Sequence, residues 1–383
     1  MDIVDECYAD KDLSLLKKLT LVIPTYNRNY YLSRCLWYHA HFPFGQIIVA
    51  DSSPEEKKVV NRETVEKVRE MFEANVLYLE YEPETEKYGG DIVRKWGNAV
   101  MHVETEYTQV CTDKEFVIPT TSCKCIGFLM KNPDYATAEG MNYQLYHQYN
   151  INVSFFPWNG KYSIPYDKVF DRLMKHCDST SQFSVYNTSV MRQTHELIDR
   201  YQIFDIRIGE TAAEVLKIMI GKAKKYVDIP GNIRDLTSLP SFPQLNNLKV
   251  KTESSFARYP HLYEYPKDIY DTLLDNLSNC LYELLIDEIE SLPIDFNIKE
   301  WANNLIKNRY GVSKYHHPLL QNYLFQIIWE VIPIHLRYII SARFGEASYE
   351  KWVPRRSVTD EMKCINKITN IYRSHYKKDK SIL

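Results

Sequence analysis

The sequence predicts an α/β fold, a mixed sheet flanked by helices, followed by a helical domain. Short apolar runs alternate with longer amphipathic runs over the first half of the chain, as in proteins built around a sheet. Several apolar runs end in proline or in small polar residues, which terminate strands. Beyond residue 267 the apolar residues recur at helical spacing. We place the domain boundary near residue 255, which divides the chain into 1–255 and 256–383.

The expected strands are short and apolar, and the helices between them are amphipathic. Strands are predicted over residues 19–24, 46–51, 76–81, 107–111, 135–138 and 224–230. Helices are predicted over residues 30–40, 55–73, 90–102, 118–131, 189–201 and 210–222. Residues 150–190 are rich in aromatic side chains and are expected to be irregular, apart from the start of the helix at 189. Residues 231–262 contain three prolines and are expected to form a linker.

The second domain is expected to consist of helices over residues 267–292, 298–309, 316–345 and 357–376, with Pro333 breaking the third. Residues 351–383 carry nine Lys and Arg against three Asp and Glu. Such a tail either docks on an anionic membrane surface or forms a solvated terminal helix, and we favour the second slightly. Contacts with the acceptor or within a homo-oligomer are further roles considered for this domain.

The composition is that of a soluble globular protein. The 383 residues carry a formal net charge of -3, and 45% of them are hydrophobic. This balance argues against wholesale nucleic-acid binding, which requires a strongly basic domain. The eight cysteines lack the spacing of a disulfide framework, the first residues lack an apolar signal core, and no run of about 20 apolar residues occurs. We therefore expect a cytoplasmic protein.

Polar residues follow three of the expected strands at the point where each strand ends. In chain order, these turns are residues 24–28 (PTYNR), 51–53 (DSS) and 112–115 (TDKE). Ligands of open α/β sheets bind at the carboxyl edge of the strands. We therefore expect the three turns to converge on a single crevice. For either of the first two turns taken alone, helix capping explains the residues equally well.

The third turn carries two carboxylates that suit a metal ion. Asp113 and Glu115 stand two positions apart, so in an extended segment they share one face. Hard oxygen ligands of this kind bind Mg²⁺ or Mn²⁺, which neutralises a diphosphate leaving group. Lys114 lies between them and either weakens metal binding or partly replaces the ion. The alternative is a solvated turn whose charges only aid solubility.

Taken together, the three turns resemble the motifs of the GT-A glycosyltransferases, family 2 in particular. Residues 22–28 are similar to an opening segment that ends in P-T-[YF]-N-R, residues 47–53 to [IV]-[IV]-V-x-D-x-S, and residues 113–115 to D-x-D. A bacterial group that acts in surface-polysaccharide assembly has D-D-D-F and later N-P-D-Y…G. This chain has DKEF at 113–116 and NPDY at 132–135, before Gly140. The resemblance covers about residues 19–235.

The resemblance implies a GT-A fold, a nucleotide-sugar donor and an acceptor that is a glycan or a lipid-linked glycan. A glycine pair opens the helix at 90–102, and a helix N-terminus attracts phosphate. The implied metal ligands are Asp113 and Glu115. The implied donor and nucleotide site consists of Pro24, Thr25, Tyr26, Asn27, Arg28, Asp51, Ser52, Ser53, Gly90, Arg94, Lys95, Asn98, Thr112, Asp113 and Lys114.

Inversion at the anomeric carbon needs a base that takes the acceptor hydroxyl proton. In inverting relatives this base is a carboxylate at a helix start, in a motif similar to G-E-D. Residues 209–211 read GET, so Glu210 takes this role, with Asp205 in reserve. The alternative for Glu210 is charge complementarity at the start of the helix expected from 210 onward.

Two further residues are candidates for ligand contacts. Relatives often carry a basic residue near Arg234, which would reach the leaving diphosphate. Trp158 is either a stacking platform for the acceptor or a core aromatic.

Two other functions share this fold. A sugar nucleotidyltransferase usually opens with a Gly-rich loop after the first strand, whereas this chain has PTYNR there. A catalytically degenerate nucleotide-binding assembly module is the third hypothesis, because Lys114 and Thr211 replace expected acids.

Overall fold

The computed structural model describes residues 7–8, 11–148, 152–157, 163–175, 183–235, 260, 262–310, 361, 363–365, 367 and 368. The expected domain boundary near residue 255, the helix over 316–345 and Trp158 lie outside these residues. So do most of the basic tail and most of the helix expected over 357–376.

The described residues form a nine-stranded mixed sheet, and this confirms the predicted fold class. The strand order is β3-β2-β1-β4-β8-β6-β9-β5, with β7 paired to β6. The first four strands are parallel, and they are β1 (Leu19–Thr25), β2 (Gln46–Asp51), β3 (Val76–Glu80) and β4 (Tyr107–Val110). The others are β5 (Glu115–Val117), β6 (Tyr135–Gln148), β7 (Asn152–Pro157), β8 (Val185–Asn187) and β9 (Lys222–Asp235).

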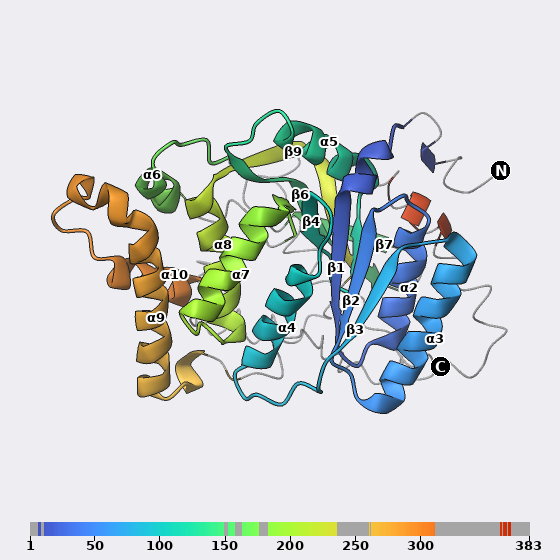
Figure 1. Ribbon diagram of the computed structural model, residues 1–383, viewed down its shortest axis with the longest axis horizontal. Helices are drawn as coiled ribbons and strands as arrows, with labels where there is room; N and C mark the ends of the chain where they lie inside the picture. The colour runs from blue at the N-terminus through green and yellow to red at the C-terminus, as the bar shows by residue number, and fades with distance from the viewer. Residues whose placement is uncertain are drawn as a thin grey trace, which may run out of the picture.

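Helices cover both faces of the parallel strands (Figure 1). On one face lie α2 (Asn29–Ala40) and α3 (Glu55–Phe72), and on the other α4 (Gly90–Met101), α7 (Thr188–Arg200) and α8 (Ile206–Ile220). Side chains of a strand alternate between faces. Accordingly, Leu21 and Ile23 of β1 pack in the cluster that contains α2, whereas Val22 packs with Ala99 of α4. Two shorter helices are α5 (Pro119–Leu129) and α6 (Val169–Met174).

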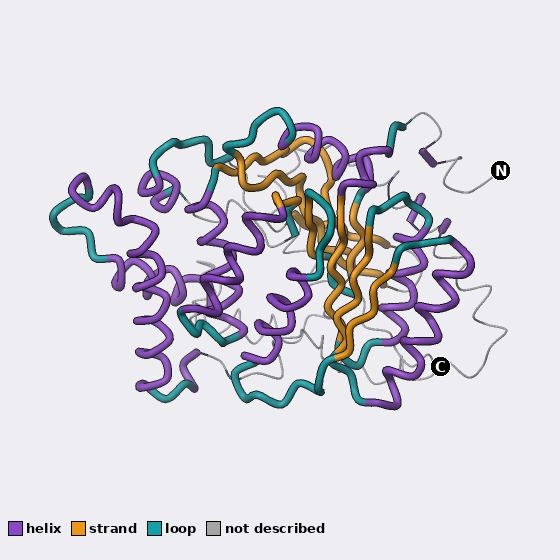
Figure 2. The backbone as a smooth tube through the Cα atoms, viewed as in Figure 1, coloured by secondary structure: helices purple, strands orange, loops and turns teal. Residues whose placement is uncertain are grey.

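The helices after the sheet pack against α7 and α8 rather than around a core of their own. They are α9 (Lys267–Leu285) and α10 (Ile298–Tyr310), with 3-10 turns at Leu262–Glu264 and Ile286–Ser291, whereas a further 3-10 turn at Ser14–Lys18 precedes β1. Leu277 and Leu281 belong to the same buried cluster as Val215 and Leu216 of α8. Figure 2 shows these helices as a layer beyond α8, on the side away from the sheet.

Three local expectations are corrected. Residues 150–190 contain β7, α6 and β8 as well as irregular segments. The strand expected over 135–138 extends to Gln148, and the supposed linker begins later, because β9 continues to Asp235. Glycines permit this pairing: a Cβ added to Gly231 would lie 2.9 Å from the Cα of Gly140.

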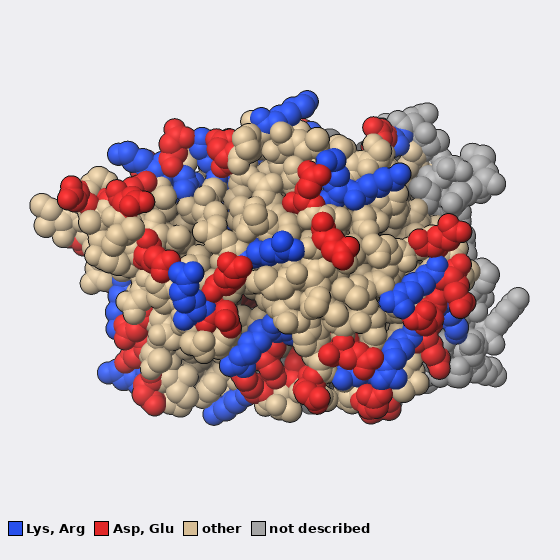
Figure 3. Space-filling model, in the orientation of Figure 1, with Lys and Arg blue, Asp and Glu red and all other residues tan. Residues whose placement is uncertain are grey.

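The distribution of surface charge and the length of the helices bear on contacts with a membrane. On the face in Figure 3, basic and acidic side chains are interspersed. Within the described ranges, every helix is too short or too polar to cross a bilayer.

His195 of α7 is buried, with 6% of its surface exposed. Its ring packs against α4, where a Cβ on Gly97 would lie 3.4 Å from Nδ1. Burial lowers the pKa of His195 to about 4.

We therefore expect stability to depend on the protonation of this histidine. Unfolded His195 binds a proton below about pH 6.5 while folded His195 stays neutral down to about pH 4. The contribution of His195 to the free energy of unfolding is therefore complete above about pH 6.5. It falls by up to about 3 kcal/mol as the pH is lowered from about 6.5 to about 4. Urea unfolding of wild type and His195→Leu across this range measures the difference, with exposed His102→Leu as control. A wild-type-minus-variant difference that does not change with pH would contradict the expectation.

Candidate active site at the carboxyl edge of the sheet

The turns after β1, β2 and β4 meet at one edge of the sheet. Thr25 and Asp51, the last residues of β1 and β2, are direct partners in the parallel register. Beyond them, the Ser52 N–H donates to the Thr25 carbonyl at 3.3 Å. On the other side of β1, the Cys111 N–H donates to Val22 at 2.9 Å. The carboxyl ends of these strands therefore deliver all three turns to the same place, as at the ligand-binding edge of open α/β sheets.

The first two turns are joined by backbone and side-chain hydrogen bonds. Asn27 has a left-handed backbone with φ 54°, which asparagine tolerates better than most residues. Its N–H donates to Ser53 Oγ at 2.8 Å, and the Ser53 N–H donates to Asp51 Oδ1 at 2.8 Å. This chain of contacts fixes the position of the exposed Asn27 side chain.

Asp51 is fully buried, and both of its carboxylate oxygens have donors within the fold. Asn61 Nδ2 and Tyr78 Oη donate to Oδ2 at 2.7 and 2.6 Å, in addition to the Ser53 N–H at Oδ1. In this arrangement Asp51 positions the second turn.

Lys95 of α4 connects the helix to the first two turns. Its Nζ donates to the Thr25 carbonyl at 3.2 Å, to Ser52 Oγ at 2.6 Å and to Glu84 at 2.6 Å. The Lys95 and Glu84 side chains are only 4% and 3% exposed. A buried ammonium with a buried carboxylate partner therefore lies where the turns meet.

Asp113 joins the third turn to the first. Thr25 Oγ1 donates to Oδ2 at 2.9 Å, and Arg28 Nη1 donates to Oδ1 at 3.2 Å. The first turn therefore contacts the third through Asp113 and the second through Ser53, so the three turns that the sequence predicts to converge do so around the first.

Glu115 does not continue an extended segment from Asp113. The Glu115 N–H donates to the Thr112 carbonyl at 2.9 Å, which closes a turn, and β5 begins at Glu115. The Thr112 N–H donates back to Glu115 Oε2 at 2.8 Å, and Arg234 Nε lies 3.5 Å from Oε1. Burial raises the pKa of the Glu115 carboxyl to about 7, and the Arg234 guanidinium opposes this rise. The expectation that Asp113 and Glu115 share one face of an extended segment is therefore wrong, because a turn separates them.

The remaining predicted donor-site residues lie at different depths. Pro24 is buried in β1, Tyr26 and Thr112 are half-buried, and the Lys114 ammonium lies 4.4 Å from the centre of the Tyr31 ring. Arg94 and Asn98 lie on the exposed side of α4, on which Arg94 pairs with Glu86 and Asn98 accepts from Tyr81 at 2.7 Å. Of the candidate residues on α4, Lys95 makes the side-chain contacts with the turns.

The start of α8 lies against the start of α4. The Ile206 N–H donates to the Tyr88 carbonyl at 2.9 Å, and a Cβ on Gly90 would lie 2.8 Å from the Phe204 carbonyl oxygen. A Cβ on Gly209 would lie 3.0 Å from Val93. This packing places Gly209, the neighbour of Glu210, against the first turn of α4.

The helix begins at Ile206, not at Glu210, and this corrects the predicted helix start. Asp205 is the N-cap: Oδ1 accepts from the N–H groups of Arg207 and Ile208 at 2.9 and 2.8 Å, and Oδ2 accepts from Tyr265 Oη. Glu210 therefore belongs to the second turn of α8 and is 7% exposed. Helix capping accounts for Asp205, whereas it does not account for Glu210.

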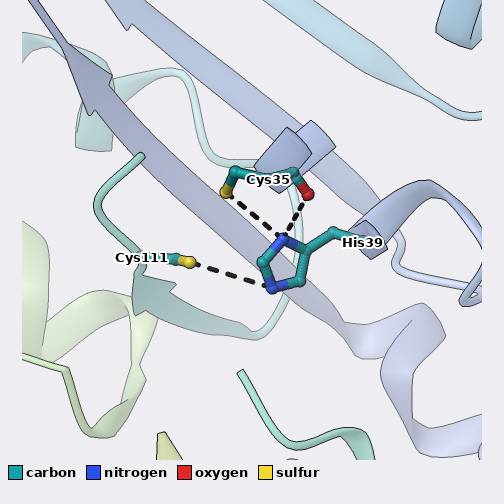
Figure 4. A group of neighbouring side chains, drawn as sticks. All are labelled: Cys35, His39 and Cys111. Carbon is teal, nitrogen blue, oxygen red and sulfur yellow. Dashed lines mark hydrogen bonds between the residues drawn. The ribbon is translucent and has the colours of Figure 1, made fainter. Parts of the chain in front are cut away.

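Beneath the third turn lies a buried group formed by Cys35, His39 and Cys111 (Figure 4). The Cys35 and Cys111 thiols lie 3.6 and 3.5 Å from the backbone carbonyl oxygen of Glu115. The Val117 N–H donates to His39 Nε2 at 3.1 Å, so the proton resides on Nδ1, which donates to the Cys35 carbonyl at 2.8 Å. Because both ring nitrogens are engaged, the group supports the turn and does not fit a metal ion.

Sequence reasoning missed Glu84 and this supporting group. Glu84 lies in the segment EPETEK, where nothing in the pattern separates it from Glu82 and Glu86. Cys35 and His39 lie one helical turn apart in α2, but their approach to Cys111 depends on how α2 packs on β4.

Comparisons with known proteins detect similarity of structure only. No family model matches the sequence, and no curated protein matches it. The fold is similar to S. aureus TarS 1–349 in complex with UDP, at 12% identity and a TM-score of 0.47, covering 94% of this chain and 92% of that chain. TarS 1–349 with UDP-GlcNAc matches with a TM-score of 0.48 at the same identity and coverage.

A further similar structure is the mannosyltransferase PcManGT from Pyrobaculum calidifontis in complex with GDP-Man and Mn²⁺. The identity is 12% and the TM-score 0.40, covering 92% of this chain and 86% of that chain. Because these identities and TM-scores are low, we rest no functional assignment on them.

Proposed function

We propose that the protein is a glycosyltransferase that moves a sugar from a nucleotide-sugar donor to a glycan or lipid-linked glycan. The convergence of the turns after β1, β2 and β4 with Lys95 of α4 is the observation that supports this most strongly. Asn27, Arg28 and Lys114 then contact the nucleotide and its phosphates. The motif resemblance favours a role in bacterial surface polysaccharide synthesis.

The chemistry that fits this site is a single displacement with inversion. The diphosphate leaves as charge develops on its oxygens, and fixed positive groups stabilise that charge best when they are already in place. Arg28 and Lys95 are held by Asp113 and Glu84, so their positions are set before a ligand binds. Glu210 takes the proton of the acceptor hydroxyl, and Asp205 retains its cap.

A panel of UDP-, GDP- and TDP-sugars tests the proposal by release of nucleoside diphosphate. We expect hydrolysis or transfer with one class of base and a loss of about tenfold or more for Asp113→Ala, because Arg28 and Thr25 lose their shared partner. The exposed Asp199→Ala is the matched control. Binding without hydrolysis or transfer would favour the catalytically degenerate nucleotide-binding module. Failure of every nucleotide sugar and nucleoside diphosphate to react or bind would contradict the proposal.

A further inference from the structure

The two carboxylates expected to bind a metal ion are already held by arginines. Arg28 and Thr25 donate to the two oxygens of Asp113. At Glu115, the Thr112 N–H donates to one oxygen and Arg234 lies beside the other. Three of the four oxygens therefore accept a hydrogen bond, and the fourth, Glu115 Oε1, lies 3.5 Å from Arg234 Nε.

The arginines, not the carboxylates, face the solvent. The side chains of Asp113 and Glu115 are 1% and 0% exposed, whereas those of Arg28 and Arg234 are 23% and 20% exposed. A ligand that arrives from solvent meets the two guanidinium groups first. A guanidinium has five N–H donors in a planar fork, so one that contacts a carboxylate retains donors for phosphate.

This arrangement does not fit Mg²⁺ or Mn²⁺. Mg²⁺ binds with near-octahedral geometry and usually keeps several waters, which a fully buried carboxylate behind an arginine does not allow. Two basic groups, Arg28 and Arg234, already lie beside these carboxylates at the positions that a cation would take.

From these contacts we infer that Arg28 and Arg234 bind the donor diphosphate directly, without a divalent metal ion. The inference rests on the proposed function and specifies its cofactor requirement. In this site Asp113 and Glu115 are positioning residues, which orient the two guanidinium groups toward the phosphates.

Calorimetric titration of the full chain with UDP, GDP and ADP tests the inference, in EDTA and in Mn²⁺ or Mg²⁺. We expect one of these nucleotides to bind with dissociation constants that agree within about threefold across the three conditions. Binding that requires metal would overturn the inference and keep the proposed function. Absence of binding under every condition would overturn both.

Two variants address the arginines. Arg28→Gln and Arg234→Gln should each weaken nucleotide binding in EDTA by about tenfold to a hundredfold, because each removes a charge-assisted contact to phosphate. Arg62→Gln, which breaks an exposed ion pair with Glu80 on α3 and β3, is the matched control. Unchanged affinity in both site variants would contradict the inference.

A third variant distinguishes direct binding of the diphosphate by arginines from binding through a metal ion, and it keeps both arginines. Glu115→Gln keeps the side-chain shape and an acceptor oxygen for Arg234 but deletes the charge. We expect equal or tighter nucleotide binding in EDTA, because Arg234 loses a competing anion. Binding that Mn²⁺ strengthens in the wild type but not in Glu115→Gln would instead identify Glu115 as a metal ligand.

Discussion

Glu210→Gln is expected to lower kcat for glycosyl transfer by about a hundredfold to ten thousandfold, which is the usual contribution of a general base. The substitution keeps size and hydrogen bonding but removes the group that accepts the hydroxyl proton. Binding of the nucleoside diphosphate should not change, because the proposed nucleotide contacts come from the turns and α4. Steady-state transfer and calorimetry on the same preparations measure the two effects.

The variant Asp205→Asn is the most informative comparison with Glu210→Gln. Asparagine caps helices as well as aspartate does, so Asp205→Asn preserves the start of α8 while removing a second carboxylate near Glu210. We expect this variant to retain most of its activity. If it loses transfer while Glu210→Gln keeps it, the two residues have been assigned the wrong way round. Exposed Glu196→Gln on α7 controls for the loss of one acidic side chain.

Lys95→Met is expected to lower the free energy of unfolding by about 3–5 kcal/mol and to abolish nucleotide binding. Removing one partner of a buried ion pair leaves the other charge without compensation, and Glu84 is 3% exposed. Ser52 Oγ and the Thr25 carbonyl lose a donor in the same step. Urea unfolding followed by circular dichroism measures the stability, with exposed Lys124→Met on α5 as control.

The double variant Lys95→Met, Glu84→Gln separates folding from binding. It removes both charges, so most of the lost stability should return, while nucleotide binding should stay weak. If Lys95→Met lowers the free energy of unfolding no more than Lys124→Met does, the buried pair does not stabilise the junction of the turns. Recovery of binding in the double variant would show that Lys95 acts only through the fold.

Much of the parallel half of the sheet can be predicted from the sequence. Strands such as Leu19–Thr25 and Gln46–Asp51 are mostly apolar and end at polar turns, and both features are local. The short strands β5 and β8 were not predicted, because three residues are too few to show a period. Their positions depend on pairing with β9 and with β4 and β6.

The start of α8 was predicted wrongly for a different reason. Residues 205–209 contain Asp205, an arginine and a glycine, so the helical pattern becomes clear only from Glu210. The hydrogen bonds from Arg207 and Ile208 to Asp205 extend the helix backward by four residues. Asp205 is a favoured N-cap residue, so a capping search one turn earlier would have found it.

The sequence by itself determined that the polar turns 24–28, 51–53 and 112–115 end buried strands, because hydrophobic runs and the residues that stop them are neighbours in the chain. Only the tertiary structure decided which charges neutralise one another there. Glu84 meets Lys95 and Glu115 meets Arg234 across loops and sheet pairings, and the strength of such pairs depends on burial and distance. The sequence therefore predicted both acidic and basic residues at the site, and only the fold pairs Arg28 with Asp113 and Arg234 with Glu115.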